Sequence, residues 1–288
     1  MDDNKQTFEG RLNRVKGSVC GLIVGDCAGA VTEFMSPGEI RKKYGRVTEM
    51  LPGSWIKGRK IGESTDDSAM MLCVARSLVA TGGIPDYKDM ADRLLAWLNA
   101  KPKDVGVACR RGLASYRATG RLCNGDEDTL GNGGLLRVPG FALAGRSWQE
   151  AMKNVALTHN SSLQYRAIQS YVLAVQAAVR GANNREILSE IRGIGIRRIG
   201  VTNNWGDVKN TLSSALNWFN TTDSFEECIV AAINGGHDSD SCAAIAGGLA
   251  GAHYGYDAIP KRWLVALDGT THNEAVELAD KLLTLLVR

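Results

Sequence analysis

The feature that most constrains the fold is a run of small residues directly after an acidic motif. The motif is segment 234–241 (NGGHDSDS), and segment 242–255 (CAAIAGGLAGAHYG) is almost entirely small and apolar. This composition predicts a buried helix in close contact with neighbouring backbones, because few long side chains hold them apart. Carboxylates at the start of a buried helix are costly unless positive charge meets them. The helix dipole supplies part of that charge, and a metal ion would supply the rest.

Two further acidic groups stand at the ends of helices rich in small residues. The predicted helix 8–31 contains Asp26 and is followed by Glu33. Segment 65–67 (Thr-Asp-Asp) precedes the apolar segment 69–80, where Thr65 would cap the helix and the acids would suit its dipole. Taken singly, Asp26 is explained as a buried brace between loops, Glu33 as a solvated loop residue and 65–67 as a cap. Spacing along the chain leaves open whether the three groups meet.

If Glu33 and the acids of segments 65–67 and 238–241 converge, five carboxylates lie together and cannot all stay ionised without cations. Their ligand atoms are all hard oxygens, which favour Mg²⁺ or Mn²⁺ over zinc. The number of ligands suits two ions.

The rest of the chain shows helical periodicity and no convincing set of strands. Further helices are predicted at 86–100, 105–119, 147–158, 162–180, 185–192, 207–219, 225–233, 261–267 and 273–287. Segments 35–64 and 120–134 look irregular. We find no repeat and no linker, so the sequence predicts an all-α, compact, single-domain multi-helix bundle over residues 1–288.

Composition limits the partners. The net charge of +3 does not predict nucleic-acid binding, and the basic runs 41–43 and 197–198 are expected on the surface. Seven cysteines without a CxxC pair indicate buried reduced thiols and no Cys/His zinc site. No apolar run approaches the ~20 residues that span a bilayer, and the N-terminus is polar. We expect a cytoplasmic protein with no membrane contact, and a monomer because no long exposed apolar face stands out.

Two further motifs are weaker signals. The glycine-rich segment 131–134 (GNGG) would make backbone amides accessible to a ligand, although a plain turn also explains it. His159 interrupts two predicted helices, where a cap or loop contact is the ordinary role.

Taken together, these segments resemble the ADP-ribosylglycohydrolase family, which includes the dinitrogenase reductase-activating glycohydrolases and the ADP-ribosyl-acceptor hydrolases. The resemblance is carried, in the family's order, by 25–33 (GDCAGAVTE), 64–68 (STDDS), 131–138 (GNGGLLRV), 157–159 (LTH) and 235–251. It implies an all-α fold with a centre of two Mg²⁺ ions, with Mn²⁺ as a substitute. The implied metal ligands are Thr65, Asp66, Asp67, Asp238, Asp240 and Ser241.

Three positions depart from the family pattern. Ser241 stands where threonine is usual, which retains a hydroxyl. Gly134 replaces the serine of a GNGS-type segment, so that hydroxyl is lost. His237 lies beside the acids where the family often has glycine, and the sequence assigns it no role.

The resemblance implies hydrolysis of the bond between C1″ of the distal ribose and an acceptor atom of a modified protein, with release of ADP-ribose. Glu33 would position or deprotonate the attacking water. Asp104 resembles an aspartate of the bacterial arginine-cleaving branch and would hold or protonate the guanidinium leaving group. The pyrophosphate and adenosine would be received by Gly131, Asn132, Gly133, Gly134 and His159.

The sequence therefore favours an ADP-ribosyl-arginine hydrolase that reverses mono-ADP-ribosylation. Three alternatives stay open: a serine-linked or polymeric ADP-ribose hydrolase, a non-catalytic ADP-ribose-binding member, and a two-metal hydrolase of another small substrate. Retention of every expected type of ligand argues against a non-catalytic role.

Overall fold

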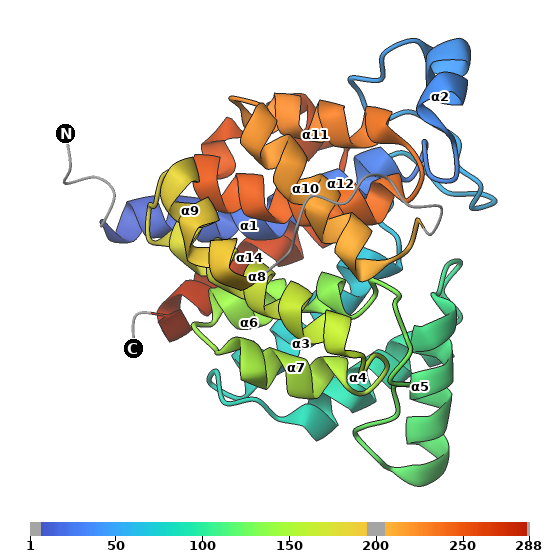
Figure 1. Ribbon diagram of the computed structural model, residues 1–288, viewed down its shortest axis with the longest axis vertical. Helices are drawn as coiled ribbons and strands as arrows, with labels where there is room; N and C mark the ends of the chain where they lie inside the picture. The colour runs from blue at the N-terminus through green and yellow to red at the C-terminus, as the bar shows by residue number, and fades with distance from the viewer. Residues whose placement is uncertain (1–6, 195–204, 287–288) are drawn as a thin grey trace.

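The computed structural model describes residues 7–194 and 205–286, and every named element in these ranges is a helix (Figure 1). The α-helices are α1 (Phe8–Gly29), α2 (Pro37–Tyr44), α3 (Asp66–Ala80), α4 (Tyr87–Asn99), α5 (Val107–Thr119), α6 (Pro139–Leu143), α7 (Trp148–Val155), α8 (Ser162–Val179), α9 (Asn184–Ile191), α10 (Val208–Thr221), α11 (Phe225–Gly235), α12 (Ser239–Tyr254), α13 (Lys261–Ala266) and α14 (Gly269–Leu286). Short 3₁₀ turns are η2 (Leu135–Arg137), η3 (Arg192–Ile194) and η4 (Tyr256–Ala258). The prediction of an all-α fold is confirmed.

The centre of the fold is the antiparallel pair α1 and α12, which pack against each other more extensively than any other two helices. Glycines at every fourth position of α1 face α12. A Cβ added at Gly17 would lie 2.2 Å from the carbonyl oxygen of Gly251, and one at Gly25 would lie 2.0 Å from that of Ala243. Only glycine allows two backbones to approach so closely. The predicted close contact at the small-residue helix is therefore present.

The other helices enclose this pair. Helices α8, α10, α11 and α14 pack directly on it. In the view of Figure 1, α11 lies above the pair, whereas α3, α6 and α7 lie below it. Because α1 and α12 run in opposite directions, the end of α1 and the start of α12 lie at the same end of the bundle, where Gly29 meets the backbone of Ser239.

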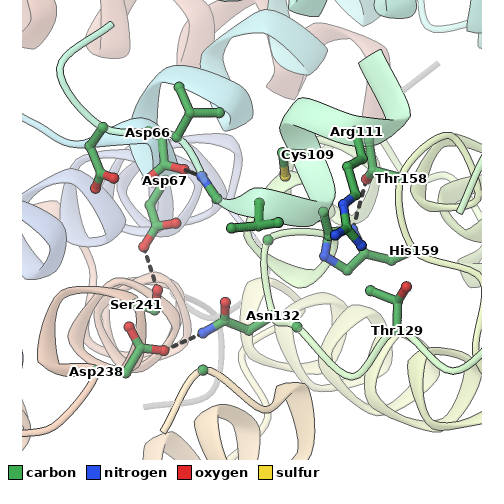
Figure 2. Close-up of a pocket in the computed structure, with 18 of the residues that line it drawn as sticks. Asp66, Asp67, Cys109, Arg111, Thr129, Asn132, Thr158, His159, Asp238 and Ser241 are labelled. Atoms are coloured by element: carbon green, nitrogen blue, oxygen red, sulfur yellow. Dashed lines mark hydrogen bonds between the residues drawn. The ribbon is translucent and has the colours of Figure 1, made fainter. Parts of the chain in front are cut away.

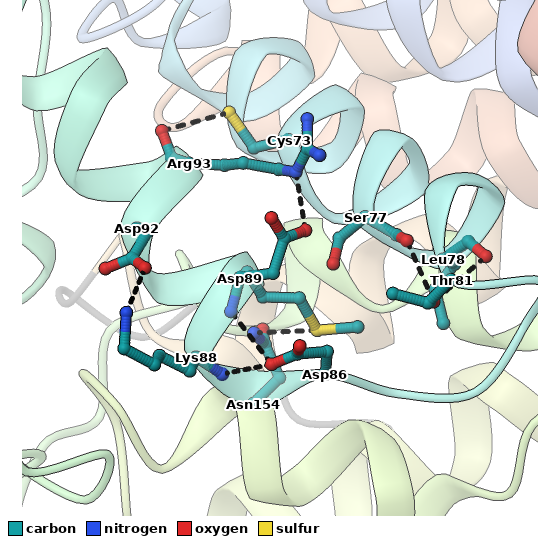
Figure 3. A network of polar contacts seen from close by, with 11 residues as sticks. Cys73, Ser77, Leu78, Thr81, Asp86, Lys88, Asp89, Asp92, Arg93 and Asn154 are labelled. Carbon is teal, nitrogen blue, oxygen red and sulfur yellow. Dashed lines mark hydrogen bonds and ion pairs between the residues drawn. The ribbon is translucent and has the colours of Figure 1, made fainter.

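Helix α3, which carries the second acidic group, is held in place by α4 (Figure 3). The Cys73 thiol of α3 contacts the carbonyl oxygen of Arg93, and Arg93 in turn pairs with Asp89 one turn earlier in α4. Asn154 of α7 donates to the sulfur of Met90 on another face of α4. These contacts join α3 to α4 and α4 to α7.

Two expectations are wrong. Segment 35–64 is not wholly irregular, because Ser36 and Glu39 form a capping box and Pro37 occupies the first turn of α2. The glycines and prolines that suggested a loop serve here as start and stop signals. Cys123 is exposed and departs from the expected burial of the cysteines, whereas the other six are buried.

The basic run 41–43 is exposed as expected, and the run 197–198 lies outside the described residues. None of the helices in the described ranges is long and apolar enough to cross a membrane.

Candidate metal centre and cavity

A cavity of about 610 Å³ opens where α1 ends and where α3, α5 and α12 begin. The predicted site residues that line it are Glu33, Asp66, Asp67, Asp104, Gly131, Asn132, Gly133, His159, Asp238, Asp240 and Ser241. Thr65 and Gly134 do not line it. The Thr65 side chain caps α3 by accepting from the backbone N–H of Asp67, and Gly134 packs against Val155.

The acids of the three sequence segments meet at one end of this cavity. Glu33, Asp238 and Asp240 each offer a carboxylate oxygen, and these three atoms lie within 4.8 Å of one another. Ser241 connects this group to the start of α3, because its hydroxyl donates to Asp67 at 2.8 Å across 174 positions of sequence (Figure 2). The hypothesis that the three groups converge therefore agrees with the structure.

A pair of backbone hydrogen bonds holds the two loops of the cluster together. The N–H of Phe34 donates to the carbonyl of His237 at 2.6 Å, and the N–H of His237 donates to that of Met35 at 2.7 Å. Phe34 and His237 both have a φ of 62°, in the left-handed region that non-glycine residues seldom adopt. The conformation explains why glycine suits the position of His237. The reciprocal hydrogen bonds join the loop that follows Glu33 to the loop that precedes Asp238 and Asp240.

Asp26 has the structural role that the sequence suggested, that of a buried brace. It is fully buried, and its carboxylate accepts from the backbone N–H of Thr65, at 3.1 Å, and from that of Ser68, also at 3.1 Å. The Ser68 hydroxyl donates to the same carboxylate. These bonds attach the start of α3 to α1, so Asp26 positions Asp66 and Asp67 without lining the cavity.

The pKa values of the clustered carboxyl groups lie above their ordinary values. Burial raises the pKa of Glu33 to about 8, and burial together with the charge of Asp104 raises that of Asp66 to about 7. Burial raises the pKa of Asp238 to about 6 and also that of Asp104. Among the described residues that line the cavity, Arg111 is the only lysine or arginine. A cluster of oxygen ligands with so little compensating charge fits a divalent cation such as Mg²⁺.

The opposite end of the cavity is built around His159, which Figure 2 shows together with Thr129, Thr158 and Arg111. The Thr158 hydroxyl accepts from the buried guanidinium of Arg137 at 2.7 Å, so its own proton is free for Nδ1 of His159, also at 2.7 Å. Nε2 of His159 then carries the ring proton beside Gly131. Burial and the charge of Arg137 lower the pKa of His159 to about 3. His159 is therefore a neutral donor at neutral pH.

The sequence named Asn132 as a candidate ligand contact but not as a partner of the acidic cluster, and it did not single out Trp55 or Phe34. The Asn132 amide donates to Asp238 and, at 2.9 Å, to Thr211, so this side chain supports the acidic cluster while its neighbours form the cavity wall. The indole N–H of Trp55 donates to Glu33, and the ring of Phe34 packs on that of Trp55. No periodicity or spacing marks these residues. The one available signal was the presence of aromatic residues in loops beside acids.

Comparison with known proteins decides the family. Residues 7–288 match the model of the family described as ADP-ribosylglycohydrolase. The chain is a member of the ADP-ribosylglycohydrolase family. The resemblance inferred from the separate motifs is thus confirmed over nearly the whole chain.

Relatives and a solved structure agree with this membership. The chain is 33% identical to the ADP-ribosyl-[dinitrogen reductase] glycohydrolase of Rhodospirillum rubrum, over 95% of this chain and 96% of that protein. It is 30% identical to the ADP-ribosylarginine hydrolase Tri1 of Pseudomonas putida (strain GB-1), over 96% of this chain and 80% of that protein. A solved structure titled ADP-ribosylglycohydrolase-related protein complex superposes with a TM-score of 0.84 at 34% identity, covering 96% of this chain and 99% of the other. The chain thus belongs to a family whose named members here are a glycohydrolase and a hydrolase of ADP-ribosyl linkages.

Proposed function

We propose that the protein hydrolyses the N-glycosidic bond between ADP-ribose and an arginine side chain of a modified protein, with two Mg²⁺ ions as cofactor. The observation that carries the proposal is the convergence of Glu33, Asp238 and Asp240 with Asp67 and Ser241 at one end of a single cavity. The ions would be held by Asp66, Asp67, Asp238, Asp240 and Ser241, with Thr65 at the edge of this set. When bound, Mg²⁺ would supply positive charge that orients the ribose hydroxyls and acidifies water.

The cavity residues suit the two ends of ADP-ribose. His159, a neutral donor at Nε2, and the backbone amides of Gly131 and Gly133 would receive the pyrophosphate and adenosine. The distal ribose would lie at the acidic end. Positive charge develops at C1″ as the glycosidic bond breaks, and the carboxylates there stabilise it.

Glu33 and Asp104 would manage the protons. Glu33 lies within the acidic cluster, where a bound cation would keep its carboxylate ionised and able to take a proton from water. The water oxygen forms the new bond to C1″, the bond from C1″ to the guanidino nitrogen breaks, and that nitrogen leaves with its electron pair and gains a proton. Asp104 lines the same end of the cavity and would hold the guanidinium or supply this proton.

The arginine linkage is favoured over a serine linkage by this charge distribution. Asp104 lies outside the proposed metal set, so its carboxylate remains to meet a cation. An acceptor serine offers no positive charge for it. Two of the family relatives carry names that specify dinitrogen reductase or ADP-ribosylarginine.

The proposal is tested by incubating the protein with Mg²⁺ and arginine-ADP-ribosylated protein and measuring released ADP-ribose. Serine-linked substrate is run in parallel. We expect release from the arginine linkage, its loss with EDTA, and its loss in Asp240→Asn with an unchanged helical CD signal. Release from the serine linkage alone would overturn the assignment of the acceptor. Full activity of Asp240→Asn would refute the metal set, and tight ADP-ribose binding without turnover on either linkage would indicate a binding module.

A further inference from the structure

Two aromatic rings stand at the acidic end of the cavity with half of their surface exposed. Phe34 is 52% exposed and Trp55 is 50% exposed, and both line the cavity together with Asp66 and Asp104. Their ring centroids lie 5.3 Å apart with an interplanar angle of 55°, which is a favourable aromatic contact. Large rings that are exposed side by side beside an enzyme's cavity offer contact area to a ligand.

Both rings are fixed relative to the acids. The backbone of Phe34 is held in its left-handed conformation by the hydrogen bond to His237. The indole N–H of Trp55 donates to Glu33, the residue proposed to act on the water. The two rings therefore form a surface whose position follows that of the acidic cluster, which we call the aromatic platform (Phe34 and Trp55).

The chemistry around the platform selects the kind of side chain that it fits. The charge of Asp104 acts on Glu33 and on Asp66, so these three carboxylates lie near one another. Arg111, the one lysine or arginine in the described lining, lies beside His159 (Figure 2). A planar guanidinium is attracted to carboxylates through its N–H groups and stacks on aromatic faces. A serine side chain has no positive charge to meet the carboxylates and no planar group to stack on the rings. The methylene groups of arginine also suit Val107, which is 68% exposed and lines the same cavity.

We propose that the aromatic platform is the acceptor subsite, where Phe34 and Trp55 stack on the guanidinium of the modified arginine and thereby select this linkage. This inference rests on the proposed function, because it assigns the acceptor side of the same cavity. Trp55 has a second role as a positioning residue for Glu33. Occupation of the subsite and the orientation of that carboxylate are thus linked through one indole ring.

The test separates these roles with two variants. Phe34→Leu keeps an apolar side chain of similar size and removes a stacking face, so KM for arginine-linked substrate should rise about 5- to 10-fold with little change in kcat. Trp55→Phe keeps a stacking face and removes the N–H donor, so kcat should fall while KM changes little. The affinity for free ADP-ribose with Mg²⁺ should be unchanged in Phe34→Leu. Phe8→Leu is the matched control, because Phe8 is 56% exposed and does not line the cavity.

A second measurement needs no turnover. Agmatine, which carries the guanidinium and the methylene stem of arginine, is titrated by calorimetry into the protein loaded with Mg²⁺ and ADP-ribose. We expect binding to wild type and to Phe8→Leu, with affinity reduced about 5- to 10-fold in Phe34→Leu.

The outcomes distinguish the two hypotheses. Unchanged KM and unchanged agmatine affinity in Phe34→Leu would overturn the subsite, even if wild type cleaves the arginine linkage. Agmatine binding that depends on Phe34, without release of ADP-ribose from the arginine linkage, would refute the proposed function and leave the guanidinium site standing. Absence of agmatine binding to wild type would overturn the subsite as well.

Discussion

Substitution of Gly25 by alanine tests whether contact between the backbones of α1 and α12 holds the fold together. Gly25 lies near the C-terminal end of α1, and a Cβ added there would point at α12. An added Cβ would lie 2.0 Å from the carbonyl oxygen of Ala243, 2.4 Å from the carbonyl carbon and 2.8 Å from the nitrogen of Ala244. All three atoms belong to the backbone, so no side chain can rotate away.

The magnitude follows from two opposing effects. A carbon–oxygen contact of 2.0 Å is more than about 1 Å short of van der Waals separation, so the two helices must move apart along a densely packed interface. Overpacking of a core costs typically about 1–3 kcal/mol, and rigid backbone neighbours place this site at the upper end. Alanine in place of glycine gains about 1 kcal/mol of helix propensity. We expect Gly25→Ala to lower the free energy of unfolding by about 2 kcal/mol.

The assay is urea unfolding followed by CD at a helical wavelength, with Gly38→Ala as the control. Gly38 lies in α2, and an added Cβ there meets nothing closer than the Ser36 hydroxyl at 3.9 Å. The control should be as stable as wild type, or more stable by up to about 1 kcal/mol, because only helix propensity changes. A Gly25→Ala protein at least as stable as wild type would refute the reasoning that this interface has no space.

Three further predictions concern the site and its supports. In the metal-free protein, the free energy of unfolding should fall as pH rises from about 5 to about 8. The folded-state pKa values of Glu33 and Asp66, at about 8 and about 7, lie above their ordinary values of 4.5 and 3.8, so the folded state holds protons that the unfolded chain has released. Mg²⁺ should abolish this fall, and identical curves in EDTA and in Mg²⁺ would count against a cation at the cluster. Asp26→Ala should lower the free energy of unfolding, measured in urea, by about 2–4 kcal/mol, since it leaves the buried N–H groups of Thr65 and Ser68 unpaired. A decrease below about 0.5 kcal/mol would show that Asp26 is not the brace. The exposed thiol of Cys123 should react quickly with a thiol reagent in the native protein, and Cys123→Ser should remove this fast phase. A fast phase that persists in Cys123→Ser would contradict the burial of the other six cysteines.

Much of the fold could be predicted because its signals are local. Helical periodicity and cap residues depend on neighbours a few positions apart, and they located α3, α4, α8 and α12 to within a few residues. The small-residue run of α12 indicated close backbone contact without naming the partner. Helix α2 was missed because its capping box lies in a segment where proline and glycine are frequent.

The residue types of the site were also legible in the sequence. Acids beside helix starts, with hydroxyl groups next to them, indicate oxygen ligands whatever the fold. The family pattern then added Asp104 and assigned a part of the ligand to the GNGG segment, whose first three residues lie in the cavity wall.

Only the tertiary structure decided which groups meet. The distance from Asp67 to Ser241 depends on how two helices far apart in sequence are brought to one end of the bundle, and that depends on the packing of α1 against α12. The same holds for Trp55, which reaches Glu33 from a loop, and for Asn132, which reaches Asp238. These contacts arise from the summed packing of the whole core, so no local pattern around any one of the residues encodes them. The sequence by itself determined the helices and the chemistry of the ligands, and the packing of glycine against backbone determined that the ligands form one site.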